Sequence, residues 1–369
     1  MPKTKLQSAY AKSGVNYAQL DHLKISAQNA AKSTGENLMP TSYREVGSSR
    51  GESAYVIENH DHYLAIVQEG LGTKNLVADA VRSYTGRSFY DVLAIDTVAM
   101  IVNDLITVGA RPLVVQQYLA VGNGKWLEDK ERMYDLVNGW KQACDEVEAS
   151  WGGGETPALS GVIKEEVVDL AGNAIGIIEP KERLLNGDRI QDGDVIIGFE
   201  SSGIHANGIS LARKLAEKLP KGYQTKLENG TTFGEALLVP THLYSRLLQA
   251  LFAAEIELHY CVNITGHGWR KLMRPTQAFR YQIHTIPPVP IILQFLQKQL
   301  KLSDQEAYAT FNMGIGFCVY IPKQFSKQVI KIAKEHNFAA WELGTISAAK
   351  AIEIDSLHVT YNQSDLQIR

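Results

Sequence analysis

The alternation of hydrophobic and polar positions predicts short strands and helices that follow one another at the spacing of an α/β protein. In the first half, strands are expected at 54–57, 63–68, 113–121 and 168–178, and helices at 75–84, 89–108 and 127–149. In the second half, strands are expected at 194–199, 256–262, 315–321 and 341–346, and helices at 209–218, 241–254, 289–300 and 323–336. A charged turn at 179–183 separates the halves. The pattern therefore predicts two α/β domains of the α+β type, residues 1–180 and 181–369.

The helix expected at 89–108 is hydrophobic around most of its circumference, which predicts burial on nearly all sides. Asp96, Asn103 and Asp104 form a single polar stripe on this helix, because Asp96 and Asn103 lie about 20° apart around its axis and Asp104 lies about 80° from Asp96. The stripe could cap loops or pair with a basic group inside the domain. It could instead hold Mg²⁺ or nucleotide, and we favour this use because a buried carboxylate without a partner is costly.

A glycine-bearing loop, Glu69-Gly70-Leu71-Gly72-Thr73-Lys74, joins an expected strand to an expected helix. Glycine lets the backbone approach an anion, the free N–H groups of the helix start favour negative charge, and Lys74 adds a cation. The loop is a candidate phosphate cradle, although short turns of this kind also occur for structural reasons alone.

Three further segments carry polar groups next to glycine. Gly152-Gly153-Gly154-Glu155-Thr156-Pro157 is interpreted as an open loop that approaches a ligand, with a linker as the alternative. The segment 201–208 joins a strand to a helix; there Asn207 could be a plain helix N-cap and His205 an ordinary loop histidine. Thr265-Gly266-His267-Gly268 has the same ambiguity.

The amino-acid composition argues against several classes of function. The 369 residues carry 37 basic and 40 acidic side chains, which gives a formal charge of −3. The chain as a whole therefore lacks the net positive charge that attracts nucleic acid or an anionic membrane. Residues 1–20 are polar and no run of about 18 apolar residues occurs, so we expect a cytoplasmic protein without a membrane partner. The three cysteines are far apart, which argues against a disulfide framework and against a zinc site.

Seven ordered motifs resemble one family, phosphoribosylformylglycinamidine cyclo-ligase, also called aminoimidazole ribonucleotide synthetase. They are an acid-Gly-x-Gly-Thr-Lys loop (69–74), a D-x-V-A-M-x-V-N-D-L helix continued by G-A-x-P (96–112), Gly-Gly-Glu-Thr (153–156), S-S-G-x-H-x-N-G (201–208), P-T-x-x-Y (240–244), T-G-x-G (265–268) and F-N-x-G-x-G (311–316). The sequence departs from the family pattern at Glu69, at 46–53, at 157–161 and at His267.

The resemblance implies a first-domain mixed sheet that pairs in a homodimer, a C-terminal α/β domain, and an ATP- and Mg²⁺-dependent ring closure on a phosphoribosyl amidine. It implies catalytic roles for Lys74, Asp104, Glu155 and His205, and metal binding by Glu69 and Asp104. Nucleotide would contact Gly70, Gly72, Thr73, Lys74, Asp96, Asn103, Gly153, Gly154 and Thr156. Substrate would contact Ser202, Gly203, Asn207, Thr265 and Gly266. A paralogous ATP-dependent kinase or ligase, or a silent nucleotide-binding regulator, remains as an alternative.

Overall fold

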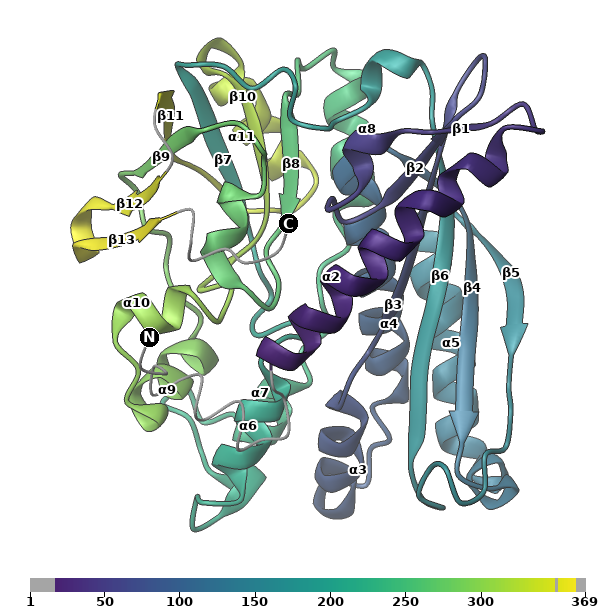
Figure 1. Cartoon of the computed structure of the whole chain (residues 1–369). Coiled ribbons are helices and arrows are strands. Elements are labelled where there is room, and N and C mark those ends of the chain that lie inside the picture. Colours follow the sequence, from purple (N-terminus) through teal and green to yellow (C-terminus); the bar gives the residue numbers. More distant parts are fainter. Residues whose placement is uncertain (1–16, 349–350, 363–369) are drawn as a thin grey trace.

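The computed structural model describes residues 17–348 and 351–362, which form two domains, each built on one β-sheet (Figure 1). The first sheet has six strands in the order β1-β2-β3-β6-β4-β5, and the second has seven in the order β13-β12-β9-β11-β7-β10-β8. The predicted two-domain architecture of mixed helices and strands is confirmed. No helix within the described ranges is long and apolar enough to cross a membrane.

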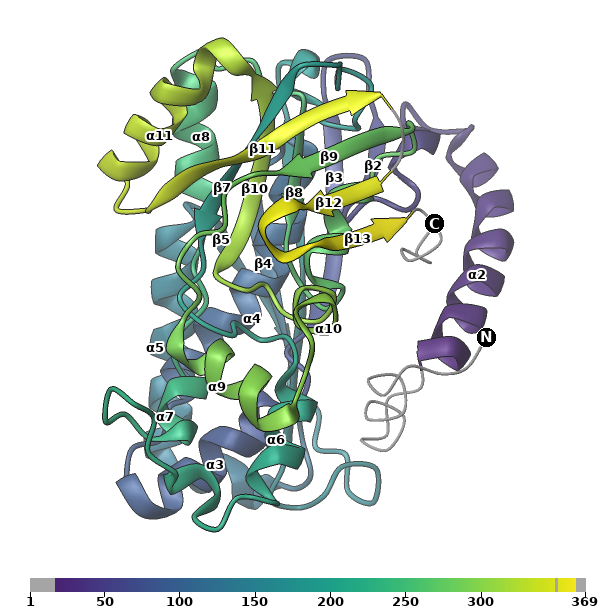
Figure 2. The same ribbon diagram turned by 90° about the vertical axis from the view of Figure 1, so that its left-hand side faces the viewer.

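Helices α4 (Tyr90–Leu105) and α5 (Lys130–Glu146) pack on one face of the first sheet, while α2 (Tyr17–Thr34) stands apart on the opposite side (Figures 1 and 2). Its strands are β1 (Arg44–Glu45), β2 (Tyr55–Glu58), β3 (Tyr63–Gly70), β4 (Arg111–Val121), β5 (Ser150–Glu155) and β6 (Val168–Ile178). The helices of this half are α2 (Tyr17–Thr34), α3 (Lys74–Thr85), α4 (Tyr90–Leu105) and α5 (Lys130–Glu146). Even-numbered residues of β6 are buried towards α4, where Gly172 and Gly176 leave room for Ile101 and Leu105. Odd-numbered residues of β6 lie on the opposite face and stay at least partly exposed.

The second sheet is more deeply buried. It contains β7 (Asp194–Glu200), β8 (Tyr260–Asn263), β9 (Phe279–Ile283), β10 (Ile315–Pro322), β11 (Ala340–Ala348), β12 (Ala351–Ile354) and β13 (Val359–Asn362). Its helices are α6 (Ile209–Ala216), α7 (Phe233–Leu237), α8 (Ser245–Ala253), α9 (Ile291–Leu300), α10 (Asp304–Tyr308) and α11 (Ser326–Glu335). The central strands β7 and β10 are buried along almost their whole length, and α8 and α11 lie together on one side of the sheet (Figure 2).

The end of α4 forms the junction between the domains. The helix continues as a 3-10 turn, Ile106–Val108, which packs against β8 of the second domain. Gly109 ends this turn with φ +86°, as the sequence predicts for a C-cap. A Cβ atom at Gly109 would lie 2.0 Å from the carbonyl oxygen of Arg183, so no other residue fits between α4 and the segment that links the domains.

Several elements were not predicted, among them β1, β9, β12, β13, α7 and α10, and two further segments differ for a clear reason. Residues 152–155, expected in a loop, belong to the edge strand β5, which pairs parallel with β4. Their glycines hide the strand pattern, but a Cβ atom at Gly154 would lie 2.0 Å from the carbonyl oxygen of Gln117, so close packing of two strands requires glycine there. Helix α2 was not predicted. Its Leu23 and Ile25 are 66% and 49% exposed, and none of residues 23 and 25–34 is buried, so this part of the helix offers no buried stripe that a hydrophobic pattern could reveal. Figure 2 shows the helix standing apart from the rest of the first domain.

Candidate active site

The polar stripe of α4 is buried at the domain junction. Asp96 Oδ1 accepts hydrogen bonds from the backbone N–H of Thr241 (2.8 Å) and from its hydroxyl (2.5 Å). Asn103 donates Nδ2 to the carbonyl of His242 (2.8 Å) and accepts the N–H of Tyr244 (3.1 Å). Both side chains thus satisfy hydrogen-bonding groups of the segment that leads into α8. These bonds are of the kind that the first alternative, capping of loops, predicts, and a use of the stripe in holding Mg²⁺ or nucleotide stays a prediction.

Lys74 is also part of this junction. Its side chain is fully buried, with Nζ 2.6 Å from Asp96 Oδ2. The same ammonium donates to the carbonyls of His205 (3.0 Å) and Val239 (3.2 Å) in the second domain. Three acceptors surround the ammonium in this structure and tie the first turn of α3 to the second domain. Contact between Lys74 and a phosphate stays a prediction.

Asp104 lies at the end of the same stripe and is 9% exposed. Its Oδ1 accepts a hydrogen bond of 2.7 Å from Nδ2 of Asn263 on β8. Glu69, the other predicted metal ligand, is near the end of β3, opposite Gly172 of β6. In the part of the chain that the structure describes, no three or more His, Cys, Asp or Glu side chains are grouped so as to hold a metal ion. A metal here would depend on oxygen ligands from a bound nucleotide or from water.

His205 is enclosed in the loop that follows β7. The residue is 3% exposed, adopts φ +60°, and accepts the backbone N–H of Ser202 at Nε2 (3.2 Å). Burial lowers the pKa of His205 well below its ordinary value of 6.5, and the neighbouring His242 and Lys74 act in the same direction. The imidazole is therefore neutral and serves as an acceptor that shapes the loop. The ring is enclosed in this structure, and a direct catalytic contact of His205 stays a prediction.

Other residues of this loop also form hydrogen bonds within the chain. The Ser202 hydroxyl donates to the carbonyl of Pro240 (2.6 Å), and the Gly203 carbonyl accepts Nδ2 of Asn312 (2.8 Å). Asn207 does not cap the helix, since the residue before α6 is Gly208 with φ +79°; its Nδ2 lies 3.8 Å from Met100 Sδ on α4.

The turn after β8 and the segment before β2 complete the junction. Thr265 and Gly266 are partly exposed, and the Thr265 carbonyl accepts the N–H of Gly268 (2.8 Å). The family-divergent segment before β2 contacts the second domain: Tyr260 donates to Glu52 (2.6 Å), and Arg274 donates to the carbonyl of Gly51 (3.0 Å). The departure from the family pattern in this segment is therefore part of the contact between the domains.

The accessible part of the predicted site lies on the first domain. A cavity of about 620 Å³, here called the amide-lined hollow, is formed by β3, β4, β5 and β6. Its polar side chains are Gln68, Gln116, Gln117, Asn173, Glu155 and Asp169. Of these side chains, the sequence analysis singled out only Glu155, together with the lining residues Gly152 and Gly154. Carboxamides within otherwise hydrophobic strands are the signal that could have identified the others.

The loop between β3 and α3 remains open. Gly70 and Gly72 are exposed, and Gly72 adopts φ +74°, a conformation that favours glycine. Thr73 occupies the N-cap position of α3 but makes no side-chain capping bond. The backbone N–H groups of the first turn thus keep their capacity to bind an anion. Gly153 and Thr156 are exposed as well, next to Glu155 at the end of β5.

Comparisons with known proteins identify the family. The N-terminal domain of AIR synthase related proteins matches residues 51–178, and the C-terminal domain matches residues 191–356. The phosphoribosylformylglycinamidine cyclo-ligase of Methanocaldococcus jannaschii is 36% identical over 313 residues, covering 84% of this chain and 83% of that protein. The chain belongs to the phosphoribosylformylglycinamidine cyclo-ligase family. The cyclo-ligase of Methanobrevibacter smithii is 34% identical over 329 residues, covering 89% of this chain and 91% of that protein.

A solved structure supports the fold of this cyclo-ligase family member. AaThiL complexed with AMPPCP and TMP has a TM-score of 0.55 at 16% sequence identity, covering 85% of this chain and 91% of that chain. The family motifs fall into two groups in this fold. The α4 motif and the 240–244 motif of the second domain are joined by hydrogen bonds across the junction, whereas the loop 70–73 and the end of β5 remain accessible.

Proposed function

We propose that this protein converts formylglycinamidine ribonucleotide to aminoimidazole ribonucleotide in purine biosynthesis. The observation that carries the proposal is the 36% identity to a cyclo-ligase over 84% of the chain, which spans both domains. ATP transfers its γ-phosphoryl group to the formyl amide oxygen, an amidine nitrogen attacks the activated carbon, and phosphate leaves as the ring closes. Such a reaction requires alignment and charge neutralisation more than a protein nucleophile.

The accessible elements of the first domain would bind ATP. The open loop with Gly70, Gly72 and Thr73 offers unpaired backbone N–H groups to phosphate oxygens. Gly153, Gly154 and Thr156 border the amide-lined hollow, where carboxamides can both donate to and accept from a nucleobase. The nucleotide analogue named with AaThiL supports nucleotide binding by this fold. Asp96, Asn103 and Lys74 would act by positioning these elements.

The oxygen donors near this loop fit Mg²⁺. Glu155 and Asp169 place carboxylates in the hollow, and Glu69 precedes the glycine loop on β3. Mg²⁺ accepts one or two protein carboxylates and takes its other ligands from water and phosphate. We propose Glu69 and Asp104 as ligands, and Mg²⁺ would neutralise the phosphate charge that develops during transfer. Glu69→Asp should shift the Mg²⁺ dependence of activity to higher Mg²⁺ concentration. An unchanged dependence would mean that Glu69 is not a metal ligand.

Substrate would bind against the second domain. Ser202, Gly203 and Asn207 lie in the loop after β7, and Thr265 and Gly266 lie in the turn after β8. Asn207 contacts Met100 of α4, so the loop after β7 lies against the first domain. Glu155 of the first domain would act on a substrate that lies between the domains. His205 would support this loop from inside.

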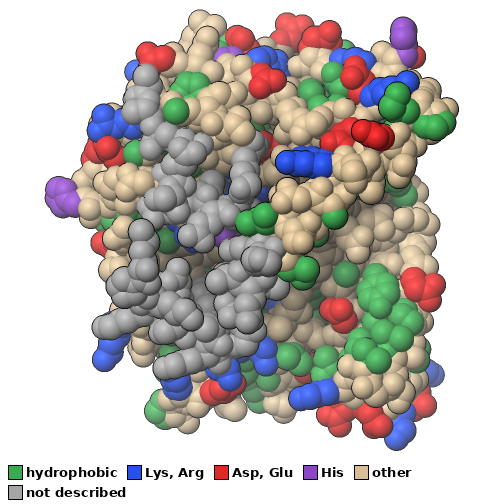
Figure 3. Space-filling model, viewed as in Figure 1, with side chains coloured by type: hydrophobic (Ala, Val, Ile, Leu, Met, Phe, Trp, Pro, Cys, Tyr) green, Lys and Arg blue, Asp and Glu red, His purple; other side chains and the backbone are tan. Residues whose placement is uncertain are grey.

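The uncovered face of the first sheet supports a homodimer. Ile66 pairs with Tyr55 on one side and Ile175 on the other, and Leu64 pairs in the same way with Ile57 and Ile177. All six side chains are only partly buried on the face opposite α4. Figure 3 shows hydrophobic side chains gathered over β6 and its neighbours on this side of the molecule. A second copy would remove this apolar surface from water.

One assay tests the proposed function. ATP hydrolysis by the purified protein is measured with and without formylglycinamidine ribonucleotide, and aminoimidazole ribonucleotide is identified by mass spectrometry. We expect phosphate release that depends on the ribonucleotide and equals the ring product in amount. Phosphoryl transfer to another small substrate would favour the paralogous kinase or ligase, and nucleotide binding without turnover would favour a silent regulator. We place the reaction in the cytoplasm.

A further inference from the structure

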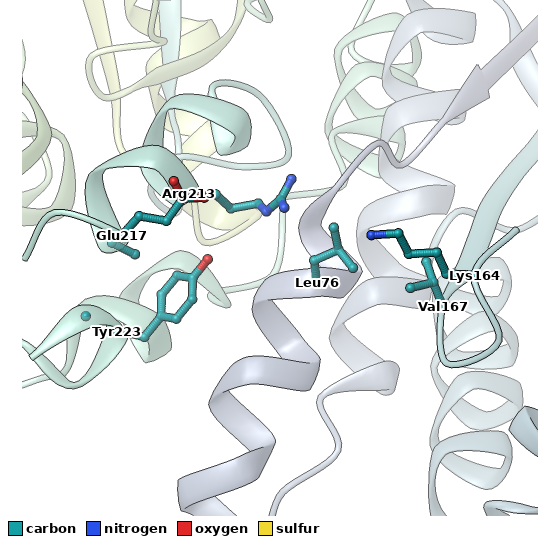
Figure 4. A pocket seen from close by; sticks show the side chains of 8 residues that line it. Leu76, Lys164, Val167, Arg213, Glu217 and Tyr223 are labelled. Atoms are coloured by element: carbon teal, nitrogen blue, oxygen red, sulfur yellow. The ribbon is translucent and has the colours of Figure 1, made fainter. Parts of the chain in front are cut away.

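A second cavity lies between the two domains and shares no lining residue with the amide-lined hollow. This domain cleft has a volume of about 530 Å³. The first domain contributes Leu76, Lys164 and Val167, and the second contributes Arg213, Glu217 and Tyr223 (Figure 4). None of these residues belongs to the motifs that the sequence analysis singled out as a site.

Two cations from different domains face each other across the cleft. Figure 4 shows the guanidinium of Arg213 and the ammonium of Lys164 directed towards the space beside Leu76. Within 17–348 and 351–362, neither has a carboxylate at ion-pair distance, and the carboxylate of Glu217 is 3.2 Å from Nζ of Lys214 instead. Two like charges directed at one space repel each other, so an anion bound between them would stabilise this arrangement.

The cleft also holds further hydrogen-bond donors, while the Glu217 carboxylate lies near Lys214. The Tyr223 ring stacks against Phe233, with 6.2 Å between ring centroids, and its hydroxyl points towards Arg213 in Figure 4. Leu76 belongs to the first turn of α3, whose backbone N–H groups receive no side-chain cap from Thr73. Arg and Lys can only donate, and the planar guanidinium matches two phosphate oxygens at once. This donor set fits a phosphate group.

We propose that Arg213 and Lys164 form a phosphate clamp for the 5′-phosphate of the ribonucleotide substrate. The assignment rests on the proposed function, which requires two phosphorylated reactants in separate sites. The amide-lined hollow and the loop 70–73 serve ATP, and the domain cleft has the volume that a sugar phosphate needs. Because one cation comes from each domain, bound phosphate bridges the domains. The clamp therefore selects the ribonucleotide over its uncharged riboside.

Calorimetric titration of the full-length protein tests the clamp with three ligands: formylglycinamidine ribonucleotide, its dephosphorylated riboside, and ATP. Arg213→Gln should weaken ribonucleotide binding at least tenfold and leave the affinities for riboside and ATP within twofold. Lys164→Gln, at an exposed position where folding is not at risk, should act in the same direction. Arg213→Lys should retain part of the affinity. The control Lys218→Gln removes the same charge from an exposed position just after α6 and should change none of them.

Three results would overturn the assignment: unchanged ribonucleotide affinity in both Gln variants, an equal loss for the riboside, or a loss confined to ATP. Circular dichroism melting establishes that each variant is folded. Failure of the proposed function has a different signature, namely no ribonucleotide binding by the unaltered protein. In that event the ³¹P line width of inorganic phosphate still reports on the clamp. Broadening by the unaltered protein that is lost in Arg213→Gln supports a phosphate site, and its absence overturns it.

Discussion

Lys74 and Asp96 form a fully buried ion pair, with 2.6 Å between Nζ and Oδ2. The pair joins α3 to α4, and each partner also bonds the second domain, Lys74 through the His205 carbonyl and Asp96 through Thr241. A buried ion pair is retained only when its remaining hydrogen-bonding capacity is satisfied, and these bonds satisfy most of it. Domain contact and ion pairing are therefore coupled at this point.

Lys74→Met should lower the free energy of unfolding by about 3 to 5 kcal/mol, because it leaves the Asp96 carboxylate buried without its cation. Urea unfolding measures the change, and combining the variant with Asp96→Asn should restore part of the loss. Lys214→Met is the control, because its ion pair with Glu217 is exposed and is expected to contribute below about 1 kcal/mol. A stable Lys74→Met protein that no longer binds ATP would instead support direct phosphate contact.

Glu155→Gln should reduce turnover at least tenfold while the melting temperature stays within about 2 °C of the original. Its carboxylate is exposed at the end of β5 and lines the amide-lined hollow, so its charge is available to ligands rather than to folding. Steady-state kinetics and thermal unfolding are compared with Glu228→Gln, an exposed acid on the second domain. Equal activity of the two variants would mean that the Glu155 carboxylate does not contribute to catalysis.

Ile175→Lys should convert a dimer to a monomer. Ile175 is in the centre of the partly buried row on the uncovered face, between Ile66 and Val114 on the neighbouring strands. A charge there cannot be buried against a second copy without large cost. Light scattering should give about twice 40.8 kDa for the unaltered chain and 40.8 kDa for the variant. Tyr134→Lys, at a 70% exposed position on α5, should leave the mass unchanged. A monomeric unaltered chain contradicts the dimer.

Acid should weaken folding below pH 6.5. Burial lowers the pKa of His205 well below its ordinary value of 6.5, and burial also lowers the pKa of His242. The unfolded chain takes up protons at these histidines as the pH falls below about 6.5, while the folded protein does not. The unfolded state therefore binds more protons, and the free energy of unfolding should decrease from pH 6.5 to 5.5.

Urea unfolding at pH 6.5, 6.0 and 5.5 measures this slope. His259 acts in the opposite sense and outside this window: its hydrogen bonds to Asp194 and Glu257 raise its pKa against the effect of burial, so its stabilisation is lost as the pH rises above 6.5. The His205→Gln, His242→Gln double variant should show a shallower slope between pH 6.5 and 5.5. An unchanged slope would mean that other groups cause the acid sensitivity.

Much of the fold could be predicted from local pattern. The helix at 89–108 and its glycine cap, and the strand at 168–178, were predicted within two residues, because a long hydrophobic surface or strict alternation reports burial directly. Helix α2 and strand β5 were not predicted, since α2 has no buried residue at positions 23 and 25–34 and half of β5 is glycine.

The sequence by itself determined that α4 is buried and carries a polar stripe, and that its motifs belong to one enzyme family. Only the tertiary structure decided what the stripe does. Its partners Thr241, Tyr244 and Asn263 are 145, 141 and 159 positions away from the residues they bond, and no local pattern encodes such a separation. The same holds for the domain cleft, because Arg213 and Lys164 become neighbours only when the two domains pack together.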